Sequence, residues 1–309
     1  MRLLTRSDFD GLMCAVLLKE VIQLDSVEFH HPKDMQDGKV TVTEKDVITN
    51  LPFNSNAGLW FDHHSSESSR FDLEEVSFKG RYEVAPSAAR VVYNYYVQQG
   101  HAEKFKKYDK ILVDVDKADS ANLTPEDVLT PKGWILLSYL MDPRTGLGKQ
   151  HDYAVSNREL MFKLIDWIPE YLHNPEALLA LPDVKSRVDR YTQDEKNFRT
   201  ELEKHSRVEG NVVITDFRGV ETPIGNRFLI YTLFPKTNIS VRVMDGRKGE
   251  FCSLALGHSI FNRTSKTDVG ALMAKYGGGG HRGAGTCQLP YSEVDSKLSE
   301  IVAKMKADG

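Results

Sequence analysis

The chain has 309 residues, of which 40% are hydrophobic and 27% are charged. This composition is typical of a folded protein and excludes disorder, collagen-like repeats and coiled coil for the whole chain. The length predicts two domains of ordinary size. No apolar run approaches the roughly 20 residues that span a bilayer, and no signal peptide is visible. Three widely spaced cysteines, Cys14, Cys252 and Cys287, suit a reducing compartment, so we expect a cytoplasmic protein.

The net charge of −4 is unevenly distributed along the chain. Residues 206–309 hold 14 Lys and Arg against 10 Asp and Glu, so residues 1–205 hold 26 against 34. This charge distribution would suit an acidic half that binds metal ions and a basic half that binds anions. Ordinary surface variation is the simpler interpretation of charge alone.

The predicted elements change in kind along the chain. In the first third, apolar segments alternate with helical ones, with strands predicted at 3–5, 27–30, 47–49 and 59–61 and helices at 12–22 and 86–99. This alternation predicts a parallel sheet with helices on both faces. After residue 150 the strand pattern stops, and helices are predicted at 157–168 and 184–204. Mixed elements follow, with strands predicted at 212–214, 239–243 and 251–254 and helices at 268–276 and 292–306.

We therefore predict an α/β fold with two domains. Residues 1–150 form a parallel-sheet domain, residues 151–205 a helical connector, and residues 206–309 a smaller mixed α/β domain.

The first polar motif, Asp8-Phe9-Asp10-Gly11, lies where a predicted strand ends and a helix begins. Ligands of open α/β sheets bind outside the carboxyl ends of the strands. Two aspartates one residue apart on such a loop can both turn toward one hard cation, and glycine permits the tight turn into the helix. Helix capping is the alternative role for an aspartate here.

Two further motifs contain metal-ligand residue types. Asp62-His63-His64 follows the predicted strand at 59–61, and an imidazole with a neighbouring carboxylate is a common metal ligand. A lone histidine is more often a core or surface residue, but three such groups in a row favour a site. The acidic cluster at 114–119 follows an apolar run, and one of Asp114, Asp116 and Asp119 could complete a metal shell.

A glycine run lies between a predicted helix and a predicted strand, at residues 277–280. Such a run permits positive φ and exposes N–H groups that can bind an anion. His281 and Arg282 follow and offer donors to phosphate oxygens. A flexible linker is the alternative, but apolar elements flank the run on both sides. We therefore predict a phosphate-binding loop that includes Gly278, Gly279 and Gly280.

In this order the motifs resemble the DHH phosphoesterase superfamily. The resemblance is to the branch with a C-terminal DHHA1 domain, which contains oligoribonucleases, pAp phosphatases and exopolyphosphatase-like proteins, and it covers nearly the whole chain. It implies Mn²⁺ or a similar divalent ion, one or two per chain, in the first domain. It also implies a substrate held by the second domain in a cleft between the two.

The resemblance implies roles for individual residues, carried over by position. Asp8, Asp10 and His63 would bind metal, with Asp116 or Asp119 as a further ligand. His64 would lie near the scissile phosphate, and Asp62 would support a ligand. In the second domain Gly279, Gly280 and His281 match the family's substrate-binding signature, and Arg242 resembles its phosphate-contacting arginine.

The chain departs from the family pattern at two places. The family has a histidine shortly before the first aspartate pair, where this chain has Leu4 and Arg6. It also has an aspartate that joins two metals, where this chain has Asn50. One metal position therefore keeps its ligands, whereas the other keeps only Asp8. Arg6 could place a guanidinium there as a fixed cation, which would give it a catalytic role.

We therefore predict a phosphoesterase that uses a divalent metal to hydrolyse phosphodiester or phosphomonoester bonds. Short oligoribonucleotides, pAp, cyclic dinucleotides and polyphosphate are the open substrate classes. The alternative is a catalytically impaired relative that binds a nucleotide or phosphate ligand as a sensor or scaffold. Retention of both aspartates, the Asp62-His63-His64 triplet and His281 favours catalysis. No membrane partner is expected, and a homodimer is the default for this class.

Overall fold

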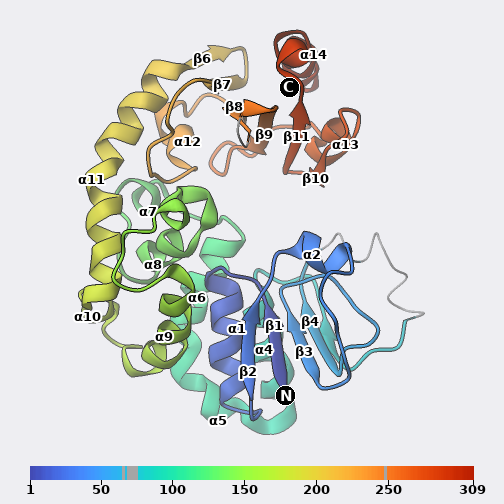
Figure 1. Ribbon diagram of the computed structural model, residues 1–309, viewed down its shortest axis with the longest axis vertical. Coiled ribbons are helices and arrows are strands. Elements are labelled where there is room, and N and C mark those ends of the chain that lie inside the picture. The colour runs from blue at the N-terminus through green and yellow to red at the C-terminus, as the bar shows by residue number, and fades with distance from the viewer. Residues whose placement is uncertain (65–66, 68–75, 247–248) are drawn as a thin grey trace. The chain divides into compact units, whose positions relative to one another are not determined.

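The computed structural model describes residues 1–64, 67, 76–246 and 249–309 (Figure 1). They divide into two units. The first comprises Met1–Leu123, Pro131–Pro143 and Leu147–Asp189, and the second comprises Thr124–Thr130, Arg144–Gly146 and Arg190–Gly309. The segment 151–205, predicted as a connector, contributes helices to both units.

The first unit is built on a five-stranded sheet in which every strand runs parallel to its neighbours. The spatial order is β2-β1-β3-β4-β5. The strands are β1 (Arg2–Thr5), β2 (Ser26–Phe29), β3 (Asp46–Thr49), β4 (Leu59–Asp62) and β5 (Gly80–Tyr82). The predicted parallel α/β sheet is therefore confirmed, and the four strands predicted in this region are all present.

Helix α1 (Phe9–Lys19) is buried on every side. Its residues from Phe9 to Leu18 are all buried, because the helix packs against β1 and against four other helices. These are α4 (Ala88–Tyr96), α6 (Asp109–Asp119), α8 (Gly133–Met141) and α9 (Asn157–Glu170). A helix covered in this way needs no polar face, which explains why its residues between Asp10 and Lys19 are apolar or glycine.

The two faces of this sheet are covered differently. Phe61 of β4 packs its ring against Tyr95 and Tyr96 of α4, on the face that the long helices cover. The neighbouring Trp60 joins a cluster with Leu4 and Ile48 that is closed by the short α2 (Pro32–Gln36) and by loops. Among the described residues, α2 meets the expectation of a helix on this face, and a loop connects β3 to β4.

Further short and long helices complete the first unit. They are α5 (Ala102–Phe105), α8 (Gly133–Met141), α10 (Pro175–Leu179) and the start of α11 (Pro182–His205). Arg187 of α11 is 1% exposed and donates to the backbone oxygens of Val155 and Asp183. These bonds attach the start of α11 to the segment that precedes α9.

The second unit contains a mixed six-stranded sheet in the order β10-β11-β9-β8-β7-β6. Only β7 and β8 run parallel. The strands are β6 (Ser206–Glu209), β7 (Val212–Phe217), β8 (Ile239–Asp245), β9 (Cys252–His258), β10 (Gly279–His281) and β11 (Ala284–Leu289). The helices are α7 (Pro125–Leu129), α12 (Leu229–Leu233), α13 (Val269–Ala274) and α14 (Val294–Asp308). The predicted mixed α/β fold of the C-terminal part is confirmed.

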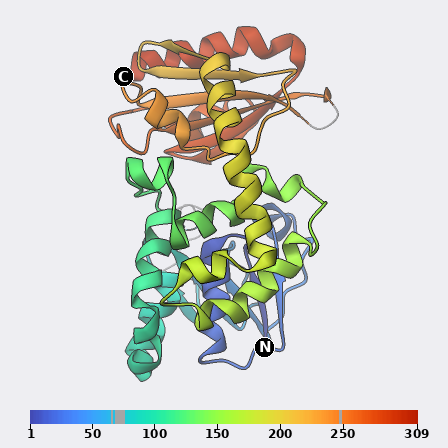
Figure 2. The same cartoon turned by 90° about the vertical axis from the view of Figure 1, so that its left-hand side faces the viewer.

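Helices α13 and α14 close the core of the second unit. Val269 and Met273 of α13 and Leu298 and Ile301 of α14 are buried against the sheet, and Figure 2 shows α14 lying along one face of it. Within the described ranges, no helix combines the length and apolar character needed to cross a bilayer. The three cysteines are buried free thiols.

An ion pair joins β1 to β3 at the end of the sheet where both strands begin. Arg2 and Asp46 are partners in the strand register, and Arg2 donates to both oxygens of Asp46 at 2.8 Å. The N–H of Thr43 also donates to Asp46, at 2.7 Å. Burial alone would raise the pKa of Asp46, but these hydrogen bonds lower it below its ordinary value.

Asp46→Asn should therefore destabilise the first unit in a pH-dependent way. At pH 7 we expect a loss of about 1.5–3 kcal/mol, the usual contribution of hydrogen bonds to a charged group. Since the folded pKa lies below the unfolded value of about 3.9, the carboxylate's contribution is lost as pH falls below about 4. Thermal unfolding midpoints between pH 3 and 7 would show the two proteins converging in acid.

Asp166→Asn is the matched control, because Asp166 is 67% exposed in its ion pair with Lys19. We expect a change of at most about 0.5 kcal/mol. A pH-independent difference between Asp46→Asn and the native protein would contradict the prediction.

Candidate functional site

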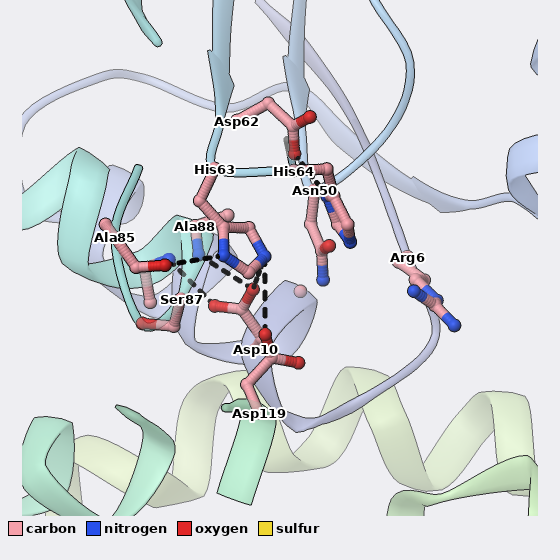
Figure 3. A network of polar contacts seen from close by, with 12 residues as sticks. Arg6, Asp10, Asn50, Asp62, His63, His64, Ala85, Ser87, Ala88 and Asp119 are labelled. Atoms are coloured by element: carbon pink, nitrogen blue, oxygen red, sulfur yellow. Dashed lines mark hydrogen bonds and ion pairs between the residues drawn. The ribbon is translucent and has the colours of Figure 1, made fainter. Parts of the chain in front are cut away.

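Polar residues gather where three adjacent strands end (Figure 3). Strand β1 leads into Arg6–Asp10, β3 leads into Asn50, and β4 ends at Asp62 and leads into His63 and His64. Because these strands are parallel neighbours, their carboxyl ends lie at one edge of the sheet. This is the edge at which open α/β sheets bind ligands.

Asp10 lies in the first turn of α1 and is held by the start of another helix. It is 2% exposed, and its carboxylate accepts the N–H groups of Ala88 (2.9 Å) and Ala89 (2.7 Å), the first residues of α4. A helix N-terminus favours a negative charge. Burial and the carboxylates of Asp119 and Asp8 nevertheless raise the pKa of Asp10 well above its ordinary value.

His63 presents a buried nitrogen to two carboxylates. Its Nδ1 lies 2.9 Å from the carbonyl oxygen of Ala85, which can only accept, so Nδ1 carries the hydrogen. The other nitrogen, Nε2, lies 3.3 Å from Asp119 and 3.8 Å from Asp10. It is buried and has no hydrogen-bond partner among the described residues. The lone pair that Nε2 carries in the neutral imidazole would therefore face these two carboxylates.

This group has the composition of a divalent-cation site. One ligand atom each from Asp10, His63 and Asp119 lies within 4.8 Å of the others. Burial, together with the charge of Asp8, raises the pKa of Asp119 against the opposing effect of His63. A divalent cation would neutralise both carboxylates and accept the lone pair of His63. The residues present therefore fit a metal ion.

Asp62, His63 and His64 form a second close group of possible ligands, in which a hydrogen bond occupies Oδ1 of Asp62, whereas its buried Oδ2 has no hydrogen-bond partner among the described residues. Nδ1 of His64 lies 2.8 Å from an oxygen of Asp62, so the shared hydrogen excludes a cation between them. Burial lowers the pKa of His64, but Asp62 raises it by more. Asp62 thus orients His64, and Asp62 itself is 1% exposed.

The structure separates Asp119 from Asp116, which the sequence did not distinguish. Asp116 accepts hydrogen bonds from Ser87 (2.7 Å) and from Nε (2.9 Å) and Nη2 (2.6 Å) of Arg90. The expectation of Asp116 as a ligand is corrected here, because its carboxylate holds the start of α4 and lies outside the group formed by Asp10, His63 and Asp119.

Asp8 also lies outside the three-ligand group. One oxygen caps α1 by accepting from the N–H of Gly11 (2.9 Å) and also accepts from Asn50 Nδ2 (3.0 Å). The other oxygen lies 3.0 Å from Nε of Arg6. Gly11 is required at this turn, because a Cβ would lie 2.1 Å from the carbonyl oxygen of Arg6.

The predicted phosphate loop of the second unit is a β-hairpin. Gly277 follows α13 with a φ of +73°, and β10 then pairs with β11 from Gly279 to His281. A Cβ on Gly278 would lie 2.0 Å from the oxygen of Thr286, and one on Gly280 would lie 2.2 Å from that of Ala284. The glycines thus permit close backbone packing, and His281 and Arg282 are exposed at the turn.

Arg242 lies on β8 of the same unit. Its guanidinium is close to the rings of Phe198 and Phe217, and burial lowers its pKa. No carboxylate of the described residues forms an ion pair with it. Phe217 is 1% exposed and belongs to the core.

Sequence reasoning missed the residues that position the metal ligands. The carbonyl of Ala85 and the N–H groups of Ala88 and Ala89 act through the backbone, so residue type does not identify them. The available signal is the helix start Pro86-Ser87, whose serine caps α4. A helix that begins near a buried aspartate is the feature to search for.

Comparison with solved structures finds one close relative over its full length. The pGpG-specific phosphodiesterase PggH from Vibrio cholerae is 44% identical, with a TM-score of 0.84, and the match covers 100% of this chain and 99% of that one. No family model and no curated protein matches the chain.

Two more distant structures share the fold. The DHH domain of a protein described as a member of a ribosomal protein family is 13% identical, with a TM-score of 0.58, over 99% of this chain and 86% of that one. RecJ from Thermus thermophilus, solved with Mn²⁺, is 13% identical, with a TM-score of 0.50, over 99% of this chain and 52% of that one.

Asp116 and Asp119 of α6 should respond differently to the same substitution. Asp119→Asn removes a charge beside His63, and we expect its Mn²⁺ affinity to fall by more than about 100-fold. Asp116→Asn weakens the contact with Arg90, and we expect lower thermal stability with less than about a tenfold change in Mn²⁺ affinity. Titration calorimetry on both variants measures this. An equal loss of affinity in both would contradict the assignment.

Proposed function

The chain belongs to the DHH superfamily of phosphoesterases and hydrolyses phosphoester bonds with a divalent metal ion, and we propose that its substrate is pGpG, the linear diguanylate with a 5′-phosphate. The full-length likeness to the pGpG-specific phosphodiesterase is the observation that carries this proposal. The site at the strand ends supplies residues of the required chemistry.

Asp10, His63 and Asp119 are the residues that would hold the ion. The fit rests on the buried lone pair of His63 and on the two carboxylates beside it. A mixed set of imidazole and carboxylate donors suits Mn²⁺, which we propose as the native ion. When bound there, it would stabilise negative charge on the reacting phosphoryl group.

The reaction adds one water to pGpG. The bond between phosphorus and the 3′-oxygen breaks, the water oxygen forms the new bond to phosphorus, and a proton from water passes to the 3′-oxygen. Two molecules of GMP result. We assign His64 to contact with the scissile phosphate through Nε2, because Asp62 holds Nδ1 and fixes the ring. A positioned donor of this kind acts on charge that develops in the transition state.

The second unit supplies cationic donors for phosphate. We propose that Arg242, His281 and Arg282 bind phosphate groups of the substrate. The guanidinium of Arg242 is partly buried and has no carboxylate partner among the described residues, which favours an anionic ligand, because a charge removed from water is stabilised by an opposite charge. The glycine hairpin that carries His281 brings the backbone close to the same ligand.

Purified protein with Mn²⁺ should convert pGpG to GMP faster than the other substrates that the sequence leaves open. The panel comprises pApA, pAp, a short oligoribonucleotide, a cyclic dinucleotide and polyphosphate. We expect kcat/KM for pGpG to exceed that for pApA by at least about tenfold. His63→Ala should abolish turnover of every substrate and Mn²⁺ binding. Chromatography of the nucleotides measures the products.

His173→Ala is the matched control, because His173 is exposed and distant in sequence from every candidate site residue; it should retain full activity. Turnover of another substrate in preference to pGpG would overturn the substrate. Absence of all turnover in folded, Mn²⁺-loaded protein would favour a ligand-binding role.

A further inference from the structure

The oxygens of Asp8 are bound by the protein itself. Its Oδ1 accepts from the N–H of Gly11 and from Asn50, and its Oδ2 pairs with Arg6. The pairing leaves the three side chains Arg6, Asp8 and Asn50 with no net charge. The neighbouring group of Asp10, His63 and Asp119 contains two carboxylates and no cation. Of these two groups, only the second therefore carries negative charge that a divalent ion would neutralise.

We propose that Arg6 takes the place of a second metal ion, so that the site binds one divalent cation per chain and the Arg6 guanidinium contacts a non-bridging oxygen of the scissile phosphate. This inference rests on the proposed phosphodiesterase function for its substrate, but the ion count stands independently of which nucleotide is hydrolysed.

Asn50 supports this inference through its hydrogen bond. An amide can donate to Asp8, and it does so at 3.0 Å. A carboxylate at this position could only accept, so it would face Asp8 as a like charge unless a cation lay between them. Asn50 is 1% exposed, with a φ of +54°, a conformation that asparagine tolerates better than most residues. Its amide nitrogen thus donates to Asp8 in place of a cation, while its buried Oδ1 has no hydrogen-bond partner among the described residues.

Arg6 is both fixed and accessible. The ion pair through Nε holds the guanidinium beside Asp8, and the side chain is 35% exposed. Among the described residues, no other carboxylate forms an ion pair with Arg6. A guanidinium has five N–H donors, so pairing at Nε is compatible with a phosphate at the outer nitrogens.

Arg6 belongs to the same group of strand-end residues as His64, which we propose contacts the phosphate. Figure 3 shows Asn50 and His64 between Arg6 and His63. Arg6 and Asn50 both bind Asp8, and Asn50 and His64 follow neighbouring parallel strands. A phosphate that contacts His64 would therefore be near the Arg6 guanidinium, which is the arrangement that stabilises developing negative charge.

The number of bound Mn²⁺ ions tests the first half of the proposal. Native protein, freed of excess metal by gel filtration, should retain one Mn²⁺ per chain by elemental analysis and give the electron paramagnetic resonance spectrum of an isolated ion. The double variant Arg6→His, Asn50→Asp should bind two, with a spectrum of coupled ions. Two ions bound by the native protein would overturn the proposal. A folded double variant that binds only one ion would also overturn it, because Asp8 is unchanged in that variant.

Arg6→Met tests the second half. It should still bind one Mn²⁺ with less than about a tenfold change in affinity, whereas kcat should fall by about 10²–10³, the usual effect of losing one donor to the transition state. Arg6→Lys should recover part of the loss, because it restores the charge without the planar guanidinium. Binding of GMP to the Mn²⁺-loaded Arg6→Met protein should weaken in parallel.

Arg199→Met is the matched control, because Arg199 is 55% exposed in an ion pair with Glu203; it should keep native kcat. Unchanged kcat and GMP affinity in Arg6→Met would overturn the phosphate contact. If pGpG is not a substrate, the kcat comparison uses whichever panel member is hydrolysed. If none is, the GMP affinity decides, so failure of the proposed function is distinguishable from failure of this inference.

Discussion

The attachment of the buried Asp10 carboxylate to the start of α4 is the contact on which the site depends. Asp10 belongs to α1, and the N–H groups of Ala88 and Ala89 belong to α4. Removing a carboxylate from water is unfavourable unless donors replace the water, and the first turn of a helix offers N–H groups with no partner inside the helix. One side chain therefore joins two helices that are far apart in the sequence and gives them a fixed relation.

The same helix start extends the constraint to α6. Ser87, which caps α4, and Arg90 both bind Asp116. Residues three apart on a helix are neighbours on one face, so attachment of Asp116 to α4 turns Asp119 toward Asp10. The carbonyl of Ala85, just before α4, meanwhile orients the ring of His63. All three candidate ligands are thus positioned from one short segment, although none of its contacting groups is an acidic or histidine side chain.

The sequence predicts which polar residues the fold brings together at the candidate site, because strand ends are local features. Asp8, Asp10 and His63 each follow an apolar segment, and parallel strands bring such ends together. The choice of Asp119 over Asp116 was beyond sequence reasoning, because it depends on which face of α6 meets α4. The glycine run was predicted as a phosphate-binding loop, and in the structure its backbone pairs with β11 in a hairpin. The glycine pattern alone does not predict this pairing, because glycine permits both a loop and the close approach of two strands.

The departures from the family pattern gain a common physical explanation from the geometry. Arg6 and Asn50 are separated by more than 40 residues in sequence, yet both bind the same carboxylate of Asp8. A change at either position alone would leave a poorly matched group: a cation beside a metal-binding carboxylate pair, or an amide beside a metal ion. Together they form a neutral unit, because the guanidinium forms an ion pair with one oxygen of Asp8 and the amide donates a hydrogen bond to the other. Unlike a metal ion, a guanidinium held this way is present at every metal concentration and is oriented before the substrate arrives. Such preorganisation is what makes a fixed charge effective in stabilising a transition state.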